Sequence, residues 1–163
     1  MNIRKFVIFI LFSCIAISVF ADTPPSWQEN TYTSKNGQYT AKLYRENKNI
    51  QPWKDKWHVK IFNKNKKAIW ESKFSHDGYA DGDLSNDGKC LIIINFWYHK
   101  DGSIITIYRK ESIKRILGKE IIKDDSSLPN TASHKIWFNE SIGFIGDKYV
   151  LRLFDDTMYS VKY

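Results

Sequence analysis

The chain has few of the residues that build disulfides or metal sites. It contains two cysteines and four histidines in 163 residues. Cys14 lies in an apolar leader, so the remainder keeps one cysteine and can form no internal disulfide. The histidines show no zinc-ligand spacing, and we predict neither a metal nor a cofactor. Cys90 directly precedes the apolar run Leu91–Ile94, so we expect it to be a small buried hydrophobic residue.

Catalytic motifs are also missing. There is no G-x-S-x-G nucleophile elbow, and Ser85 and Ser133 have no identifiable base partner in the sequence. A glycosidase needs two positioned carboxylates, and the sequence singles out no such pair. No concentrated basic block is present, which argues against a nucleic-acid partner. These absences favour a protein that is not an enzyme.

The N-terminus has the pattern of a secretory signal peptide over residues 1–21. Arg4 and Lys5 form a positive region, Phe6–Ile17 is apolar, and Ala21 supplies the small residue required for cleavage. We predict a mature chain that starts at Asp22, is secreted or periplasmic, and has no stable membrane span after cleavage. Two alternatives are an uncleaved N-terminal anchor and a lipoprotein modified at Cys14.

The mature chain is mildly basic and of single-domain size. Cleavage leaves 23 Lys and Arg against 18 Asp and Glu, a net charge of +5. Residues 22–163 suit one domain with its own core. The lysine-rich stretch Asn63–Lys67 is interpreted as a solvated turn, with an acidic surface or polymer as a weak partner.

Alternation of apolar and polar residues dominates the chain. It is clear in Tyr39–Leu43, Trp57–Ile61 and Tyr149–Leu153, and predicts strands with one buried face. Leu91–Ile94 is continuously apolar, which indicates a central strand covered on both faces. Gly118–Ser133 lacks strand character and could hold a helical turn.

Turn signals and a faint repeat organise these strands. Ser34–Tyr39 resembles Ser85–Cys90, and Gly146–Tyr149 is a weaker third copy. Spacings near fifty residues are typical of blade-like units, but three units are fewer than the four that usually close a propeller. We therefore expect an all-β fold of nine or ten strands in antiparallel blade-like hairpins, either sandwich-like or an incomplete propeller.

The order of several motifs resembles a family of uncharacterised secreted bacterial β proteins with a propeller-blade-like S-x-D-G turn. The motifs are Trp70, Gly78–Ala80, Ser85–Gly88, Trp97–Gly102, Ile107–Tyr108 and Leu128–Ser133. The resemblance implies a β fold and an extracytoplasmic location, and it implies no activity.

An acidic cluster precedes the second copy of the turn. It comprises Asp77, Asp81, Asp83 and Asp87. Asp83–Gly88 matches the first half of a calcium loop, but Ile94 occupies the twelfth position and excludes an EF-hand. We predict that Asp83 and Asp87 serve hairpin geometry. A looser calcium site is the alternative.

Three loop residues are candidate contacts with a ligand or partner. Trp53 lies outside any strand pattern, and Trp97 and His99 share a loop after the apolar run. The sequence favours an exported, non-enzymatic β binding module for an unknown protein or glycan partner outside the cytoplasm. The alternative is a hydrolase of a cell-wall or carbohydrate substrate that uses carboxylates of the acidic cluster.

Overall fold

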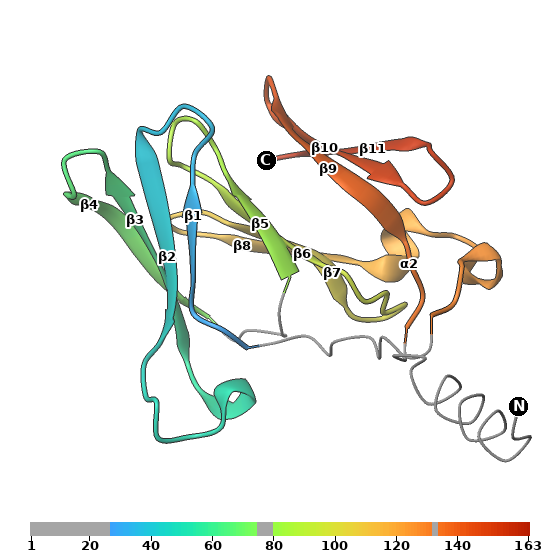
Figure 1. Ribbon diagram of the computed structural model, residues 1–163, viewed down its shortest axis with the longest axis horizontal. Helices are drawn as coiled ribbons and strands as arrows, with labels where there is room; N and C mark the ends of the chain where they lie inside the picture. Colours follow the sequence, from blue (N-terminus) through green and yellow to red (C-terminus); the bar gives the residue numbers. More distant parts are fainter. Residues whose placement is uncertain (1–26, 75–79, 132–133) are drawn as a thin grey trace, which may run out of the picture.

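The fold is all-β and consists of three antiparallel sheets that follow one another along the chain (Figure 1). The computed structural model describes residues 27–74, 80–131 and 134–163. The proposed leader and Asp77 lie outside these ranges. A short helix α2 (Gly118–Ile121) and a 3₁₀ turn at Asp125–Ser127 confirm the helical turn expected after residue 118. No helix in the described part of the chain has the length and apolarity needed to cross a membrane.

Each sheet is a simple meander. The first sheet contains β1 (Asn30–Thr33), β2 (Tyr39–Arg45), β3 (Trp57–Asn63) and β4 (Ala68–Phe74). The middle sheet contains β5 (Ala80–Leu84), β6 (Leu91–Asn95), β7 (Ser103–Tyr108) and β8 (Ile113–Leu117). The third sheet contains β9 (Phe138–Ile145), β10 (Lys148–Leu153) and β11 (Met158–Lys162). The eleven described strands slightly exceed the nine or ten expected.

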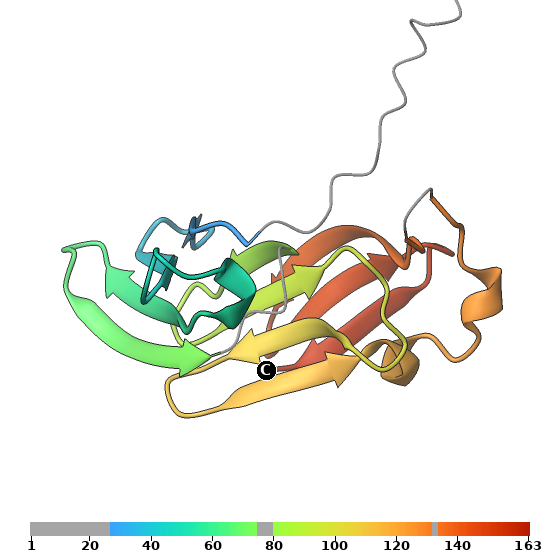
Figure 2. The same cartoon turned by 90° about the horizontal axis from the view of Figure 1, so that it is seen from below.

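The middle sheet lies between the other two and shares a core with each (Figures 1 and 2). Every residue of β6 is buried. Ile92 and Ile94 contribute to the core with the third sheet, whereas Leu91 and Ile93 contribute to the core with the first. The expected central strand with two covered faces is confirmed. The arrangement is sandwich-like, and the described strands do not close a propeller.

The alternating pattern predicted the buried faces correctly. Trp57, Val59 and Ile61 on β3 have no exposed surface. Tyr149 and Leu151 on β10 are equally buried. Cys90 is a buried core residue as expected, and burial raises the pKa of its thiol to about 12.

The two clearest repeat copies form the same turn. In each, a serine hydroxyl donates to the side chain two residues on, Ser34 to Asn36 at 2.8 Å and Ser85 to Asp87 at 2.7 Å. Both serine oxygens also accept the backbone N–H five residues on, at 3.0 Å. Gly37 and Gly88 have φ +68°, a conformation that favours glycine. The weaker third copy is a two-residue hairpin between β9 and β10 and lacks the serine.

Ionic side chains cover the outer face of the first sheet. Glu71 on β4 lies 2.9 Å from the Lys60 ammonium, accepts the Tyr44 hydroxyl at 2.8 Å, and lies 2.7 Å from the His58 ring. Lys60 contributes most, followed by Tyr44 and His58, to holding the pKa of Glu71 down at about 2. Because the folded pKa lies below the ordinary 4.5, this carboxylate stabilises the fold above that value and loses its contribution as pH falls toward 2.

Replacing Glu71 with glutamine should flatten the pH dependence of stability. We expect the wild type to exceed Glu71→Gln by about 1 kcal/mol at pH 7, a modest value because the side chain is partly solvated. The difference should shrink as pH falls from about 4.5 toward 2. Urea unfolding at pH 7, 5 and 3 measures it, with Glu111→Gln as an exposed control. A constant difference across this range would contradict the assignment.

Candidate functional site

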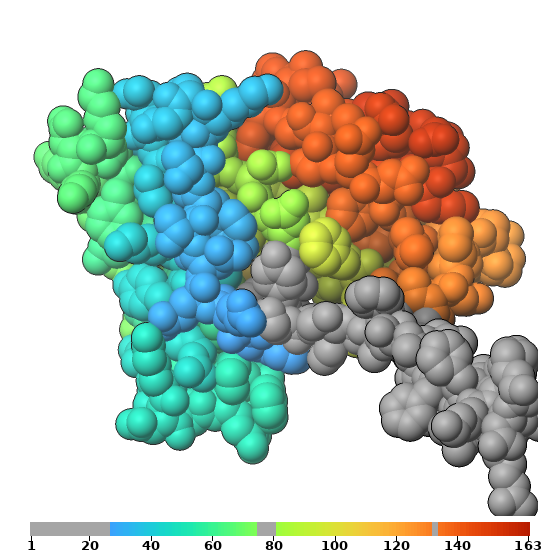
Figure 3. All heavy atoms as spheres, viewed as in Figure 1, coloured from blue at the N-terminus to red at the C-terminus, as the bar shows by residue number. Residues whose placement is uncertain are grey.

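A polar cleft lies where the first strands of the three sheets converge. Its volume is about 310 Å³. In the space-filling view, β5 is seen between the N-terminal and C-terminal sheets (Figure 3). The cleft is lined by Thr33, Lys35, Asp81, Asp83, Leu84, Asn86, Ser141, Ile142, Gly143 and Phe144. Each sheet therefore contributes to one site.

Strand alternation on β5 places its acids in the cleft. Asp81 and Asp83 are two residues apart, so their side chains share one face of the strand. Gly82 faces the first sheet, where a Cβ atom would lie 2.6 Å from the Tyr32 ring. The glycine thus allows the first sheet to pack closely on one side of β5, while the carboxylates face the cleft on the other.

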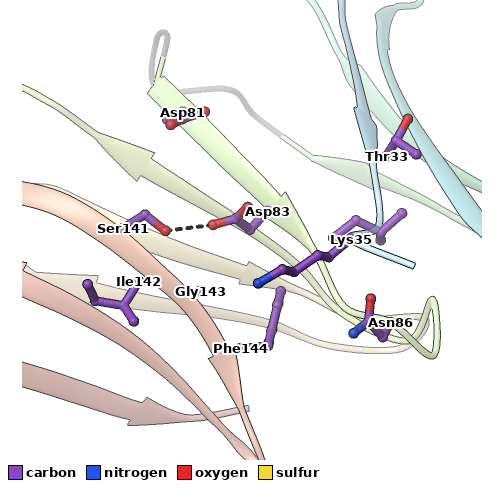
Figure 4. A pocket seen from close by; sticks show the side chains of 10 residues that line it. Thr33, Lys35, Asp81, Asp83, Asn86, Ser141, Ile142, Gly143 and Phe144 are labelled. Atoms are coloured by element: carbon purple, nitrogen blue, oxygen red, sulfur yellow. Dashed lines mark hydrogen bonds between the residues drawn. The ribbon is translucent and has the colours of Figure 1, made fainter. Parts of the chain in front are cut away.

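Asp83 joins the middle sheet to the third through two hydroxyl groups. Ser141 on β9 donates to Asp83 Oδ2 at 2.6 Å (Figure 4). The Tyr149 hydroxyl on β10 also donates to this oxygen. Ser141 and Tyr149 contact each other as well. Burial, reinforced by the Asp83 carboxylate, raises the pKa of Tyr149 far above its ordinary value. Tyr149 therefore stays protonated and remains a donor.

Removing the tyrosine hydroxyl should weaken the fold. We expect Tyr149→Phe to lose about 1–2 kcal/mol, because the buried Tyr149 hydroxyl no longer donates to the Asp83 carboxylate. Thermal or urea unfolding measures the loss. Tyr159→Phe, on the neighbouring strand β11, is the control, since no side-chain hydrogen bond of Tyr159 occurs among the described residues. Equal losses in the two variants would contradict the role of this bridge.

The paired turns form the rim of the cleft. The Asn36 backbone N–H donates to Asn86 Oδ1 at 3.0 Å, and the Asn36 side chain donates to the Asn86 carbonyl at 2.9 Å. Neighbouring Lys35 extends into the cleft toward Asp83 and Phe144 (Figure 4). The contact between turns therefore holds the backbone next to Lys35 at the rim of the cleft.

No protein-family model, curated protein or solved structure matches this chain.

Chemically, the cleft can both accept and donate hydrogen bonds. Its aspartates accept, and the Lys35 ammonium donates. The described residues of the lining include no histidine, so none of them gives Ser141 an imidazole base. The described residues hold no group of three or more His, Cys, Asp or Glu side chains placed for a metal ion.

Trp53 is at the surface, as the sequence indicates. It belongs to a 3₁₀ turn, Pro52–Lys54, before β3 and is 57% exposed. Its ring meets Trp27 edge-on, with centroids 5.8 Å apart. It lies on a loop of the first sheet, away from the loop that carries Trp97 and His99 (Figure 1). The structure therefore does not bring the three candidate contact residues together.

Trp97 and His99 lie at a separate hollow of about 460 Å³ between the loop after β6 and the segment before β9. His99 lines it together with His134 and Lys135. Trp97 stacks on the His134 ring, with centroids 5.2 Å apart and an interplanar angle of 13°. Trp97 thus positions a lining residue, and His99 is an exposed member of the lining.

The prediction for the acidic turn is half correct. Asp87 serves the turn, because it accepts the Ser85 hydroxyl and the Lys89 N–H. The prediction is wrong for Asp83, which lies on β5 and bonds to the third sheet. Asp83 and Asp87 are close in sequence, which suggested a shared role, but the Asp83 side chain lies on the face of β5 that lines the cleft.

We expect calcium to have no effect on stability. Asp83 and Asp87 are committed to different hydrogen bonds, and Ile94 supplies no ligand. A ligand that binds only the folded state adds about 2.7 kcal/mol at a hundredfold excess over its dissociation constant. Millimolar calcium should therefore leave the melting temperature unchanged. A rise of several degrees that disappears in Asp83→Ala would overturn this prediction.

Sequence reasoning missed Lys35, Ser141 and Tyr149 as site residues. Tyr149 fits an apolar row, and only its buried hydroxyl distinguishes it from a core phenylalanine. One signal was available: acids at alternate positions of a strand, as at Asp81 and Asp83, indicate a strand face that meets polar groups.

Proposed function

We propose that the protein is an exported, non-enzymatic binding module that takes a polyhydroxylated ligand, such as a glycan outside the cytoplasm, in the cleft of the three sheets. The observation that carries this proposal is the fixed Asp83 carboxylate. Two hydroxyl groups hold it in place, one of them on the fully buried Tyr149. Such an arrangement presents pre-oriented polar groups to a ligand.

Ligand chemistry follows from the lining. The aspartates accept hydrogen bonds from hydroxyl groups, and Lys35 can donate to ring or hydroxyl oxygens. Phe144 adds an apolar ring surface. The volume of about 310 Å³ is at the lower end of small-ligand sites. A short glycan segment satisfies these conditions.

Calorimetric titration with soluble peptidoglycan fragments and neutral glucan oligosaccharides tests the proposal. We expect one of these probes to bind, and Asp81→Asn or Lys35→Gln to weaken it at least tenfold without altering the melting temperature. Asp101→Asn, in an exposed pair with Lys119, is the matched control. Absence of binding by both probes, or equal affinity in cleft and control variants, would reject the cleft.

A hydrolase is the second candidate because two carboxylates line the same cleft. Their i, i+2 spacing on a strand separates the Cα atoms by roughly 6.7 Å. Inverting glycosidases hold their two carboxyl groups about 6.5–9.5 Å apart, so hydrolysis requires the Asp81 and Asp83 carboxyl groups themselves to reach that separation. Release of reducing ends from the same probes, abolished in both Asp81→Asn and Asp83→Asn, would establish hydrolysis in place of binding.

Export has its own test. N-terminal sequencing of the protein recovered from the periplasm or medium should begin at Asp22. A chain that begins at Met1, or at a lipidated Cys14, would contradict the cleaved form.

A further inference from the structure

Another hollow, lined by lysines, lies at the end of the first sheet that carries the β1–β2 and β3–β4 turns. The register pairs Tyr39 with Asn63 and Thr40 with Phe62, which places the β1–β2 turn beside the β3–β4 turn. The space between them has a volume of about 420 Å³. It is lined by Gly37, Thr40, Lys42, Phe62, Asn63, Lys64 and Lys66. This "basic hollow" shares no lining residue with the cleft.

The three lysines of the basic hollow lack acidic partners. Among the described residues, no carboxylate lies within ion-pair distance of Lys42, Lys64 or Lys66. Three lysines of the same sheet are paired, Lys48 with Glu29, Lys60 with Glu71 and Lys73 with Glu46, at 2.8–3.0 Å. Other lysines of this sheet are also unpaired among the described residues, but the basic hollow gathers three unpaired lysines around one concave site.

The lining of the basic hollow also includes an aromatic ring and polar side chains. Lys42 Nζ lies 5.7 Å from the centroid of the Phe62 ring. Thr40 and Asn63 bring a hydroxyl and an amide to the lining. An aromatic ring with hydrogen-bonding neighbours and cations matches a sugar ring that carries acidic groups.

Lys66 occupies an unusual backbone conformation. Its φ is +60°, a region that glycine and asparagine adopt more readily than lysine. The turn thus holds an ammonium group at the rim despite a less favourable backbone. This position also allows Lys66→Asn to remove the charge without harming the turn.

We propose that the basic hollow is an interaction surface for an acidic polysaccharide, with the lysines contacting carboxylate groups of successive sugars and Phe62 contacting a sugar ring. The concave shape and the Phe62 ring in its lining favour a chain-like polymer over a flat anionic membrane. The surface is separate from the cleft, so either site can be present without the other.

The test uses polygalacturonate as the anionic probe and dextran as the neutral one. The hollow variant is Lys42→Gln/Lys64→Gln/Lys66→Asn. The matched control, Lys48→Gln/Lys110→Gln/Lys162→Gln, loses the same charge from lysines that have carboxylate partners. Melting temperatures of both triple variants establish that they are folded.

We expect polygalacturonate to bind the wild type at 50 mM salt and to weaken severalfold at 300 mM, because salt screens exposed charges. The hollow variant should lose at least tenfold in affinity and the control less than twofold, with no binding of dextran.

Equal losses of affinity in both variants would show that binding depends only on the net charge of the protein, and would overturn the proposal. Absence of polygalacturonate binding, or binding only to vesicles of anionic phospholipid, would also overturn it. The cleft variant Asp81→Asn should bind polygalacturonate with wild-type affinity, so the test of the basic hollow is independent of whether the cleft binds a glycan.

Discussion

Ile93→Asp is expected to leave the protein unfolded. Ile93 is 6% exposed and lies on the face of β6 that packs against the first sheet. An aspartate there would bury an unpaired charge between two sheets, a loss of more than about 4 kcal/mol, which approaches the total stability of a native domain, about 5–15 kcal/mol. Circular dichroism and urea unfolding of the purified variant measure the outcome.

Ile145→Asp is the matched control, since Ile145 is 58% exposed at the end of β9. This variant should fold and melt close to the wild type. A soluble Ile93→Asp protein that unfolds cooperatively near the wild-type midpoint would show that the interface between the first and middle sheets does not exclude water.

Gly82→Val has the second-largest expected effect. A Cβ atom at Gly82 would lie 2.6 Å from the Tyr32 ring and 2.8 Å from the end of Ile93, and valine adds two further methyl groups. The first sheet must move away from β5 to accommodate them. We expect a loss of about 3 kcal/mol, at the upper end for overpacking. Thermal and urea unfolding measure it.

A second substitution tests whether the clash is the cause. Tyr32→Leu should remove the ring that meets the new side chain. In a double-mutant cycle, Gly82→Val should therefore cost less in the Tyr32→Leu background than in the wild type. Simple additivity of the two losses would show that the effect has another origin, such as altered backbone freedom at position 82.

Local patterns were sufficient to predict most of the strands. Alternation in Trp57–Ile61 and the continuous run Leu91–Ile94 identified buried faces correctly, because side chains on a strand alternate with period two. The repeated turn was also visible in the sequence, since its hydrogen bonds involve residues at most five positions apart. Both features depend on short-range geometry.

The cleft could not be predicted in the same way. Asp83 bonds to Ser141 and Tyr149, which lie 58 and 66 positions further along the chain. Which face of β5 meets the third sheet depends on how whole sheets pack, and no local pattern contains that information. Trp97 illustrates a related difficulty, because its stacking partner His134 belongs to a distant segment.

The position of the middle sheet has a consequence for the order of folding. Its strands have two apolar faces, and the third sheet, which covers one of them, comes last in the sequence. A chain in which β5 to β8 have folded but β9 to β11 have not yet packed against them still exposes Ile92, Ile94 and Ile107 to water. That intermediate has an exposed, isoleucine-rich apolar surface that promotes aggregation. The chain is therefore expected to be most prone to aggregation before β9–β11 pack on the middle sheet.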